Sequence, residues 1–181
     1  MWIVGLLVGL VFATLLFAYL MRRFMVKEIE LKGGFQEACR ALEEAVEEAQ
    51  GWGQPIPAWE FYKSQISKGL TYDNIKNLKI FFVCKPSHAN RIVRKFPFMS
   101  AMMPCSWSVY EKTDGKVILA KMNIGLMSKV FLGNLIGTVM GEVAREEEAI
   151  LEGLFRRLES ASGKKEKEGE KREESPEKVL S

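Results

Sequence analysis

Three residues in the middle of the chain carry soft donor atoms that could support metal or thiol chemistry: Cys84, His88 and Cys105. Two thiols and an imidazole are ligands that zinc accepts, and a pair of thiols can also serve redox chemistry. Zinc normally takes four such ligands, or three with a water molecule, at tighter spacings than Cys-x3-His followed by a distant cysteine. A metal site at these residues is therefore the weaker alternative, and the residues identify no cofactor.

The two cysteines have a second interpretation, because free cysteine usually packs as a small apolar side chain. Cys105 is the stronger functional candidate, since it follows Pro104 at the start of a predicted strand, where a groove can open. A reactive thiol would need cationic neighbours to lower its pKa, and the basic residues between positions 85 and 91 are candidates. The pattern leaves open whether Cys84 and Cys105 react, bind a ligand or pack.

The segments around these residues predict strands, a short helix and a hairpin. Residues 78–84 are apolar, β-branched and aromatic, which predicts a strand covered on both faces. Residues 87–95 predict a short helix that ends before a proline. Residues 106–111 and 116–122 predict a hairpin, because Asp114 and Gly115 form the dipeptide that a tight turn prefers.

This region resembles a bacterial family called domain of unknown function 302. Its pattern is a strand ending in Cys-x-Pro, a short helix, and Leu/Met-Pro-Cys opening a hairpin. The matching residues are Cys84-Lys85-Pro86, Ala89, Met103-Pro104-Cys105, Val109 and Glu111. The resemblance runs from about Leu31 to Leu158, and residues 122–127 look like the membrane-anchored members. It implies a compact α+β fold similar to the TATA-binding-protein-like arrangement, often self-associating, and it implies no established activity.

The N-terminal residues 2–21 form an uncharged apolar run that ends at Arg22 and Arg23. A helix of this length spans the hydrocarbon core of a bilayer, which is roughly 30 Å thick. We predict a retained anchor in the bilayer, because only Met1 precedes the run and a signal peptide would carry a basic segment there. The positive-inside rule then predicts a single-pass inner-membrane protein with its N-terminus outside and its C-terminal domain in the cytoplasm.

The C-terminal part of the chain predicts a long helical segment at residues 126–158. Gly133, Gly137 and Gly141 recur every four residues there, although each costs about 1 kcal/mol relative to Ala inside a helix. Either this stripe packs closely against a backbone, a ligand or a second subunit, or the segment breaks into two helices. From Glu142 onward the charged residues are predicted to face solvent.

The remaining segments complete a prediction of fold class and domains. A short strand is predicted at residues 29–31 and further helices at residues 35–49 and 57–68. The fold class is α+β, with a transmembrane helix followed by one compact mixed-sheet domain with packed helices. The parts are a transmembrane anchor at residues 1–23, a cytoplasmic domain at residues 24–160, and a disordered charged tail at residues 161–181.

Composition argues against several classes of function. The net charge is only +3, and we expect no nucleic-acid partner because no recognisable nucleic-acid module occurs. No phosphate-binding loop or dinucleotide fingerprint is present. Glu111 is predicted to pair with Lys121 across the hairpin, and no second acid is placed to work with Glu111 in catalysis. These exclusions favour a binding or assembly domain over an enzyme.

The interpretation we adopt is a domain that self-associates, as a homo-oligomer, and holds a small ligand or a partner in a groove. The predicted groove residues are Cys84, Pro86, Met103, Pro104, Cys105 and Trp107. The alternative is a thiol-dependent redox or sulfur-handling enzyme that uses Cys105, with Cys84 as a resolving partner. The identity of the ligand does not follow from these residues.

Overall fold

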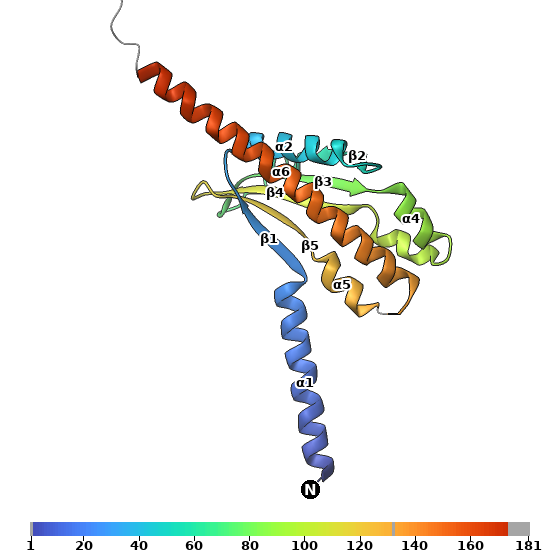
Figure 1. Ribbon diagram of the computed structural model, residues 1–181. Coiled ribbons are helices and arrows are strands. Elements are labelled where there is room, and N and C mark those ends of the chain that lie inside the picture. Colours follow the sequence, from blue (N-terminus) through green and yellow to red (C-terminus); the bar gives the residue numbers. More distant parts are fainter. Residues whose placement is uncertain (1, 132, 174–181) are drawn as a thin grey trace, which may run out of the picture.

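The computed structural model describes residues 2–131 and 133–173, which form an α+β fold around a five-stranded sheet (Figure 1). The order of the strands across the sheet is β1-β5-β4-β3-β2. The strands are β1 (Val26–Leu31), β2 (Gly53–Trp59), β3 (Ile75–Cys84), β4 (Cys105–Lys112) and β5 (Val117–Met122). All four pairings are antiparallel, so the prediction of a mixed sheet is wrong. The chain reverses direction between neighbouring strands, whereas a parallel pair would need a crossover.

Six α-helices and one 3-10 helix accompany the sheet in the described part of the chain. They are α1 (Trp2–Phe24), α2 (Phe35–Glu48), α3 (Phe61–Ile66), α4 (Pro86–Val93), the 3-10 helix η1 (Pro97–Met102), α5 (Ile124–Val130) and α6 (Leu135–Glu173). Figure 1 shows α1 extending away from the sheet, while α6 runs diagonally across it. The molecule therefore consists of the projecting helix α1 and a packed domain that contains the sheet and the other helices.

The main core lies between one face of the sheet and the helices α2 and α6. Phe81, Trp107 and Leu119 come from three neighbouring strands, and each is at most 1% exposed. Leu42 of α2 and Leu154 of α6 pack in the same cluster. Because side chains alternate along a strand, the core residues of β3, β4 and β5 lie two positions apart: Phe81 and Val83, Trp107 and Val109, and Val117 and Leu119. Burial of these large side chains supplies the main driving force for folding.

The predicted hairpin is confirmed as β4 and β5. The turn between them has Gly115 at a φ of 86°, a left-handed conformation that favours glycine. The carboxylate of Asp114 accepts a hydrogen bond from the backbone N–H of Lys116 at 3.0 Å. The strands predicted around residues 29–31 and 78–84 are also present, and both begin several residues earlier than predicted.

The helix predicted at residues 57–68 is wrong in its first part. Pro57 lies inside β2, and α3 covers only Phe61–Ile66. β2 is an edge strand with register shifts in its pairing to β3. An edge strand tolerates proline, because its outer N–H groups do not take part in the ladder. The prolines therefore belong to an edge strand of the sheet and do not begin a helix.

Both alternatives for the glycine stripe occur in the structure. The helical segment is interrupted between α5 and α6, near Gly133, whose φ is 79°. A Cβ atom placed on Gly137 would lie only 2.1 Å from the carbonyl oxygen of Phe131, so this position also packs tightly against backbone. Gly141 has nothing within 4 Å of such a Cβ atom. The segment therefore forms two helices whose junction needs Gly137.

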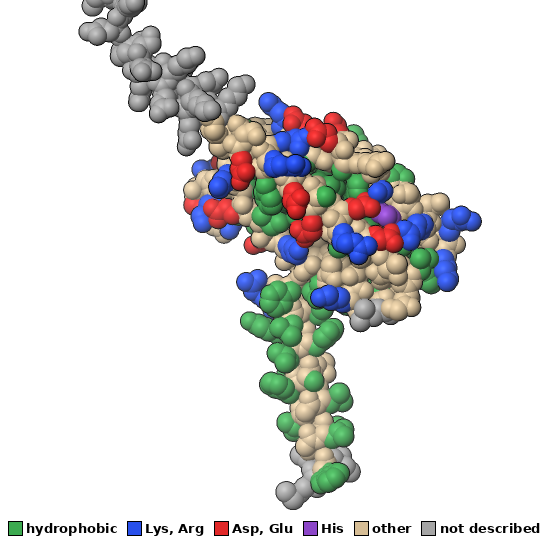
Figure 2. All heavy atoms as spheres, viewed as in Figure 1, with side chains coloured by type: hydrophobic (Ala, Val, Ile, Leu, Met, Phe, Trp, Pro, Cys, Tyr) green, Lys and Arg blue, Asp and Glu red, His purple; other side chains and the backbone are tan. Residues whose placement is uncertain are grey.

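α1 is long and apolar enough to cross a membrane over Gly5–Phe24, and none of that stretch is buried in the protein. A signal sequence near the N-terminus passes the same test, so α1 is a candidate span. Figure 2 shows hydrophobic side chains all along this rod. At the other end of the chain, α6 continues into the predicted tail as far as Glu173, and residues 174–181 lie outside the described residues.

Asn123 connects the end of α1 to the domain. Its backbone N–H donates to the carbonyl oxygen of Met25 at 2.8 Å, and its side-chain amide donates to that of Phe24 at 3.0 Å. Its side-chain oxygen also accepts from the N–H of Leu126, which caps α5. The side chain of Asn123, the residue after β5, thus joins the end of α1 to the start of α5.

Candidate functional site

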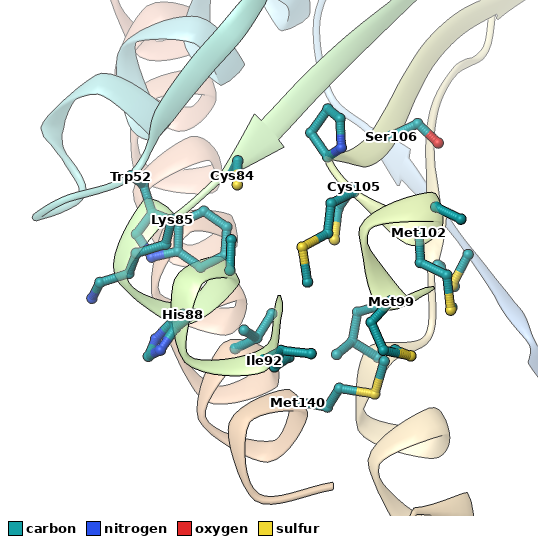
Figure 3. Close-up of a pocket in the computed structure, with 17 residues that line it drawn as sticks. Trp52, Cys84, Lys85, His88, Ile92, Met99, Met102, Cys105, Ser106 and Met140 are labelled. Atoms are coloured by element: carbon teal, nitrogen blue, oxygen red, sulfur yellow. The ribbon is translucent and has the colours of Figure 1, made fainter. Parts of the chain in front are cut away.

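A cavity of about 280 Å³ lies beside the ends of β3, β4 and β5, enclosed by α4, η1 and α6 (Figure 3). Its walls are mainly apolar and rich in sulfur. The sulfur-bearing residues that line it are Cys84, Met99, Met102, Met103, Cys105, Met122 and Met140. A concave apolar site with a few polar groups at its edge is typical of small-molecule binding.

Four of the six predicted groove residues line this cavity: Cys84, Met103, Pro104 and Cys105. The other two lie elsewhere. Pro86 is the exposed first residue of α4, where its fixed φ suits the start of a helix. Trp107 is 1% exposed and belongs to the main core rather than to the cavity wall.

The wall also contains residues that the sequence did not single out. Trp52 comes from the loop after α2 and Met140 from α6, and Met122 ends β5. These three residues are at least eighteen positions apart in the sequence, so only the tertiary fold brings them together. The one signal in the sequence is the high number of methionines near Met103.

Both thiols at the cavity are free, and their surroundings favour the protonated form. Burial raises the pKa of Cys105 to about 11, and the nearby carboxylate of Glu147 and the thiol of Cys84 act in the same direction. Burial likewise raises the pKa of Cys84. Since the thiolate is the nucleophile, these thiols are not activated for attack at neutral pH.

The basic residues that could have activated the thiols are engaged by α6 instead. Lys85 donates to Glu146 at 2.8 Å, and Arg91 donates to Glu142. His88 faces the same two carboxylates, with its Nε2 3.0 Å from Glu146 and its Nδ1 3.6 Å from Glu142. Figure 2 shows acidic and basic side chains interspersed on this face of the molecule. The cations therefore form a polar rim beside the cavity.

Glu146 is the centre of this rim, because it also accepts a hydrogen bond from the indole N–H of Trp52 at 2.7 Å. Partial burial acts to raise the pKa of Glu146, but the hydrogen bonds from Lys85, Trp52 and His88 outweigh it and lower the pKa from 4.5 to about 2. A carboxyl group with a lowered pKa stabilises the fold above its ordinary pKa and loses that contribution as the pH falls. The rim therefore weakens only between about pH 4.5 and pH 2.

The side chains of Cys84, His88 and Cys105, the alternative metal site, do not come together as a set of metal ligands. α4 turns His88 toward the carboxylates of α6, and its side chain is buried there with no hydrogen-bond partner at Nδ1. Among the described residues, no three His, Cys, Asp or Glu side chains come together in a way that could hold a metal ion.

A buried ion pair joins α6 to the sheet next to the cavity. Lys121 Nζ lies 2.6 Å from a carboxylate oxygen of Glu147, and the two side chains are only 3% and 1% exposed. The ammonium group also lies 5.0 Å from the centre of the Trp107 ring, within the range of a cation–π contact. Burial raises the pKa of Glu147, while Lys121 acts to lower it.

Two predictions about these charges are wrong. Glu147 does not face solvent, and Lys121 does not pair with Glu111, because the register places Lys121 opposite Trp107. Glu111 lies opposite Val117 and accepts a hydrogen bond from Asn77. The sequence does contain a pattern that indicates burial of Glu147. This residue lies at helical spacing within the apolar stripe of Met140, Val143, Leu151 and Leu154.

Fold and site together define a small α+β domain built on one antiparallel sheet, with an apolar cavity between the strand ends and the helices. Residues 27–154 match the family described as Domain of unknown function DUF302, and the chain belongs to this family. The family and the α+β fold predicted from the sequence are thereby confirmed. The similarity to the TATA-binding-protein-like arrangement stays a prediction.

Two known proteins illustrate the relationship. The crystal structure of an uncharacterized conserved protein DUF302 from Bacillus stearothermophilus is similar with a TM-score of 0.62 at 18% identity, covering 72% of this chain and 98% of that one. An uncharacterized protein of Aquifex aeolicus is 37% identical over 54 residues, which is 30% of this chain. That match spans 38% of the relative's length, less than half of it.

Proposed function

We propose that the protein is a membrane-anchored binding module whose sulfur-lined cavity holds a small ligand with an apolar surface. The observation that carries this proposal is the cavity itself, about 280 Å³ in volume and walled mainly by apolar groups. The charged groups at its rim neutralise one another through Glu142 and Glu146, so they offer little attraction to a strongly charged ligand. The enzyme alternative has less support, because burial keeps the thiols of Cys84 and Cys105 protonated.

Filling the cavity is expected to abolish ligand binding. Ala89 of α4 lines the cavity, whereas its neighbour Asn90 is exposed and does not. We expect native mass spectrometry of the full chain, released from nanodiscs, to show a discrete bound mass whose occupancy falls about tenfold or more in Ala89→Trp. A tenfold loss corresponds to about 1.4 kcal/mol of binding free energy.

Asn90→Trp is the matched control for that experiment, because it adds the same side chain one position along the same helix. It is expected to keep the occupancy of the parent protein. Lipid adducts that persist equally in both variants belong to the apolar helix α1. A parent chain without any bound mass, or equal occupancy in Ala89→Trp, would show that the cavity is not a ligand site.

We infer that α1 is a retained anchor and that the domain lies on the cytoplasmic side of the inner membrane. The candidate span Gly5–Phe24 supports this, together with Arg22 and Arg23 at its C-terminal end. A green fluorescent protein fused to the C-terminus is expected to fluoresce, and an alkaline phosphatase fused there to be inactive. Active phosphatase, or a purified chain that lacks its first residues, contradicts this topology.

We also infer that the domain self-associates through the face of the sheet opposite α2 and α6. Leu78, Ile80 and Phe82 alternate along β3 with the buried Phe81 and Val83, so they point to that other face and stay only half-buried. Their partners on β2, Ile56 and Trp59, are exposed, whereas Ser106 and Ser108 lie opposite Phe82 and Ile80 on β4. An exposed apolar strip of this kind is typical of a protein interface.

A charge on this face is expected to disrupt the assembly. The parent full chain in detergent is expected to give at least a dimer by light scattering, and Phe82→Glu a monomer, because the buried interface would hold an unpaired carboxylate. Thr113→Glu in the exposed hairpin turn is the control and should match the parent. A monomeric parent chain would rule out the assembly.

A further inference from the structure

We propose that the end of the domain next to α1 docks on an anionic bilayer surface, with Phe98 of η1 and Val130 of α5 entering the lipid. The inference rests on the proposed function, because it takes α1 as the anchor, and it adds a second contact with the membrane. The docking site, the α1-side surface, consists of residues 24–26, Arg94, Lys95, Phe98, Met102, Met122, Lys129 and Val130, all but one of them polar cations or exposed apolar groups with no cover in the domain.

The sheet presents one end to α1, and α5 begins at that same end. β1 begins at Val26, which lies opposite Met122 at the end of β5. Asn123 then holds the carbonyl group of Phe24, so α5 begins at Ile124 beside the end of α1. Figure 1 shows α5 at the end of the domain from which α1 projects. An anchor at α1 therefore brings this end of the sheet next to the bilayer.

α5 is long enough to reach the lipid. It runs from Ile124 to Val130, and seven residues at 1.5 Å each span about 10 Å. Figure 1 shows it leaving β5 on the same side as α1. The headgroup layer is about 5–8 Å thick on each side of the hydrocarbon core. Val130 therefore reaches this layer when the candidate span Gly5–Phe24 lies in the core.

Exposed apolar side chains are concentrated on the α1-side surface. Beyond residue 20, twelve large hydrophobic side chains of the described residues are exposed, and seven of them belong to this surface. Phe98 is 69% exposed and Val130 is 56% exposed, the two highest values among the twelve. Entry into the boundary between headgroups and acyl chains removes these groups from water, which favours docking.

The same surface is basic and has no carboxylates. Residues 1–27, 85–110 and 122–141 contain eight Lys and Arg residues and no Asp or Glu, although the chain has 23 acidic residues. Three of these cations, Lys27, Lys85 and Arg91, pair with glutamates of α6. Among the described residues, no carboxylate forms an ion pair with the other five, which are Arg22, Arg23, Arg94, Lys95 and Lys129. These cations complement the phosphates of anionic lipids.

Docking also fits the position of the cavity. Met102 and Met122 belong both to the α1-side surface and to the cavity wall. A docked domain therefore has its cavity beside the lipid, where an apolar ligand is more concentrated than in water. The sheet face around Phe82 is a separate surface and stays available for self-association.

The test places the photoreactive residue p-benzoylphenylalanine at single positions of the full chain, in nanodiscs of phosphatidylcholine with phosphatidylglycerol. Phe98→p-benzoylphenylalanine and Val130→p-benzoylphenylalanine are expected to form lipid adducts on illumination, detected by mass spectrometry. Phe155→p-benzoylphenylalanine is the matched control. Phe155 is also exposed, but it lies twenty residues along α6 from its start, about 30 Å at 1.5 Å per residue. Its adduct yield should be about tenfold lower.

Phe12→p-benzoylphenylalanine, within α1, reports on the anchor alone. Lipid adducts at position 12 but at neither position 98 nor position 130 overturn the docking and leave the anchor standing. A chain with no lipid adduct at any of the three positions contradicts the anchor and the docking together. Adducts of position 98 with a second protein chain in place of lipid would show a protein interface and would also overturn the docking.

The role of the cations is tested by combining Lys95→Gln with Lys129→Gln. We expect the lipid adduct at position 98 to fall about threefold or more, as it should for the parent chain in phosphatidylcholine alone. Lys68→Gln with Lys76→Gln is the control, because it removes the same charge from exposed lysines, and β3 begins near Lys76 at the opposite end of the sheet. Equal yields in the two double variants would overturn the proposal of an anionic surface.

Discussion

Lys121→Met is expected to lower the free energy of unfolding by about 3–5 kcal/mol, because it leaves the buried carboxylate of Glu147 without its counter-ion. The loss should appear as a lower midpoint in urea titration of the full chain, followed by tryptophan fluorescence. Trp107 lies against the ammonium group and reports on the same place.

Two further variants test whether the loss of stability in Lys121→Met comes from the unpaired charge of Glu147. The double variant Lys121→Met with Glu147→Leu should recover most of the stability, since an apolar pair of similar volume can replace a buried ion pair. Lys116→Met removes one partner of the exposed pair with Glu30 and should change stability by at most about 1 kcal/mol. Equal losses for Lys121→Met and Lys116→Met would show that burial does not strengthen the pair.

Gly137→Ala is expected to lower the free energy of unfolding by about 1–3 kcal/mol or more, because the new methyl group would meet the carbonyl oxygen of Phe131 at 2.1 Å. A backbone atom cannot move aside as a flexible side chain can, so the junction of α5 and α6 must shift. Since Met140 on α6 and Ile124 on α5 line the cavity, we also expect weaker ligand occupancy in native mass spectrometry.

Gly141→Ala is the matched control, one turn further along α6. Nothing lies within 4 Å of its new Cβ atom, and alanine favours a helix over glycine by about 1 kcal/mol. This variant should therefore be slightly more stable than the parent. Stabilisation by both substitutions would mean that the two helices do not meet closely at Gly137.

Local patterns in the sequence predicted the elements whose structure depends on neighbouring residues. The Asp114-Gly115 dipeptide located the hairpin, and the apolar periodicity of residues 35–49 located α2. The predicted strand end at Cys84 and the predicted hairpin start at Cys105 lie on strands that pair in the sheet. The anchor, the oligomer and the ligand stay predictions.

Features that depend on register and on long-range packing could not be predicted in the same way. The alternation of residues along the hairpin predicts a pair between Lys121 and Glu111, but the actual partner depends on the register set by the turn. The sequence predicts a solvent-exposed Glu147 because a glutamate on a helix is usually exposed, and its partner Lys121 lies far away in the chain, on β5. Trp52 and Met140 could not be assigned to the cavity, since nothing local connects them to β4.

The hydrogen bonds of Asn123 have a mechanical consequence. Only Met25 separates the last residue of α1 from the first residue of β1, and Asn123 holds the carbonyl groups of Phe24 and Met25. The domain therefore cannot swivel on α1 as it would on a flexible tether. In a bilayer, tilting or twisting of α1 would act as a lever on Asn123, and the residues on either side of Asn123, Met122 and Ile124, are part of the cavity wall.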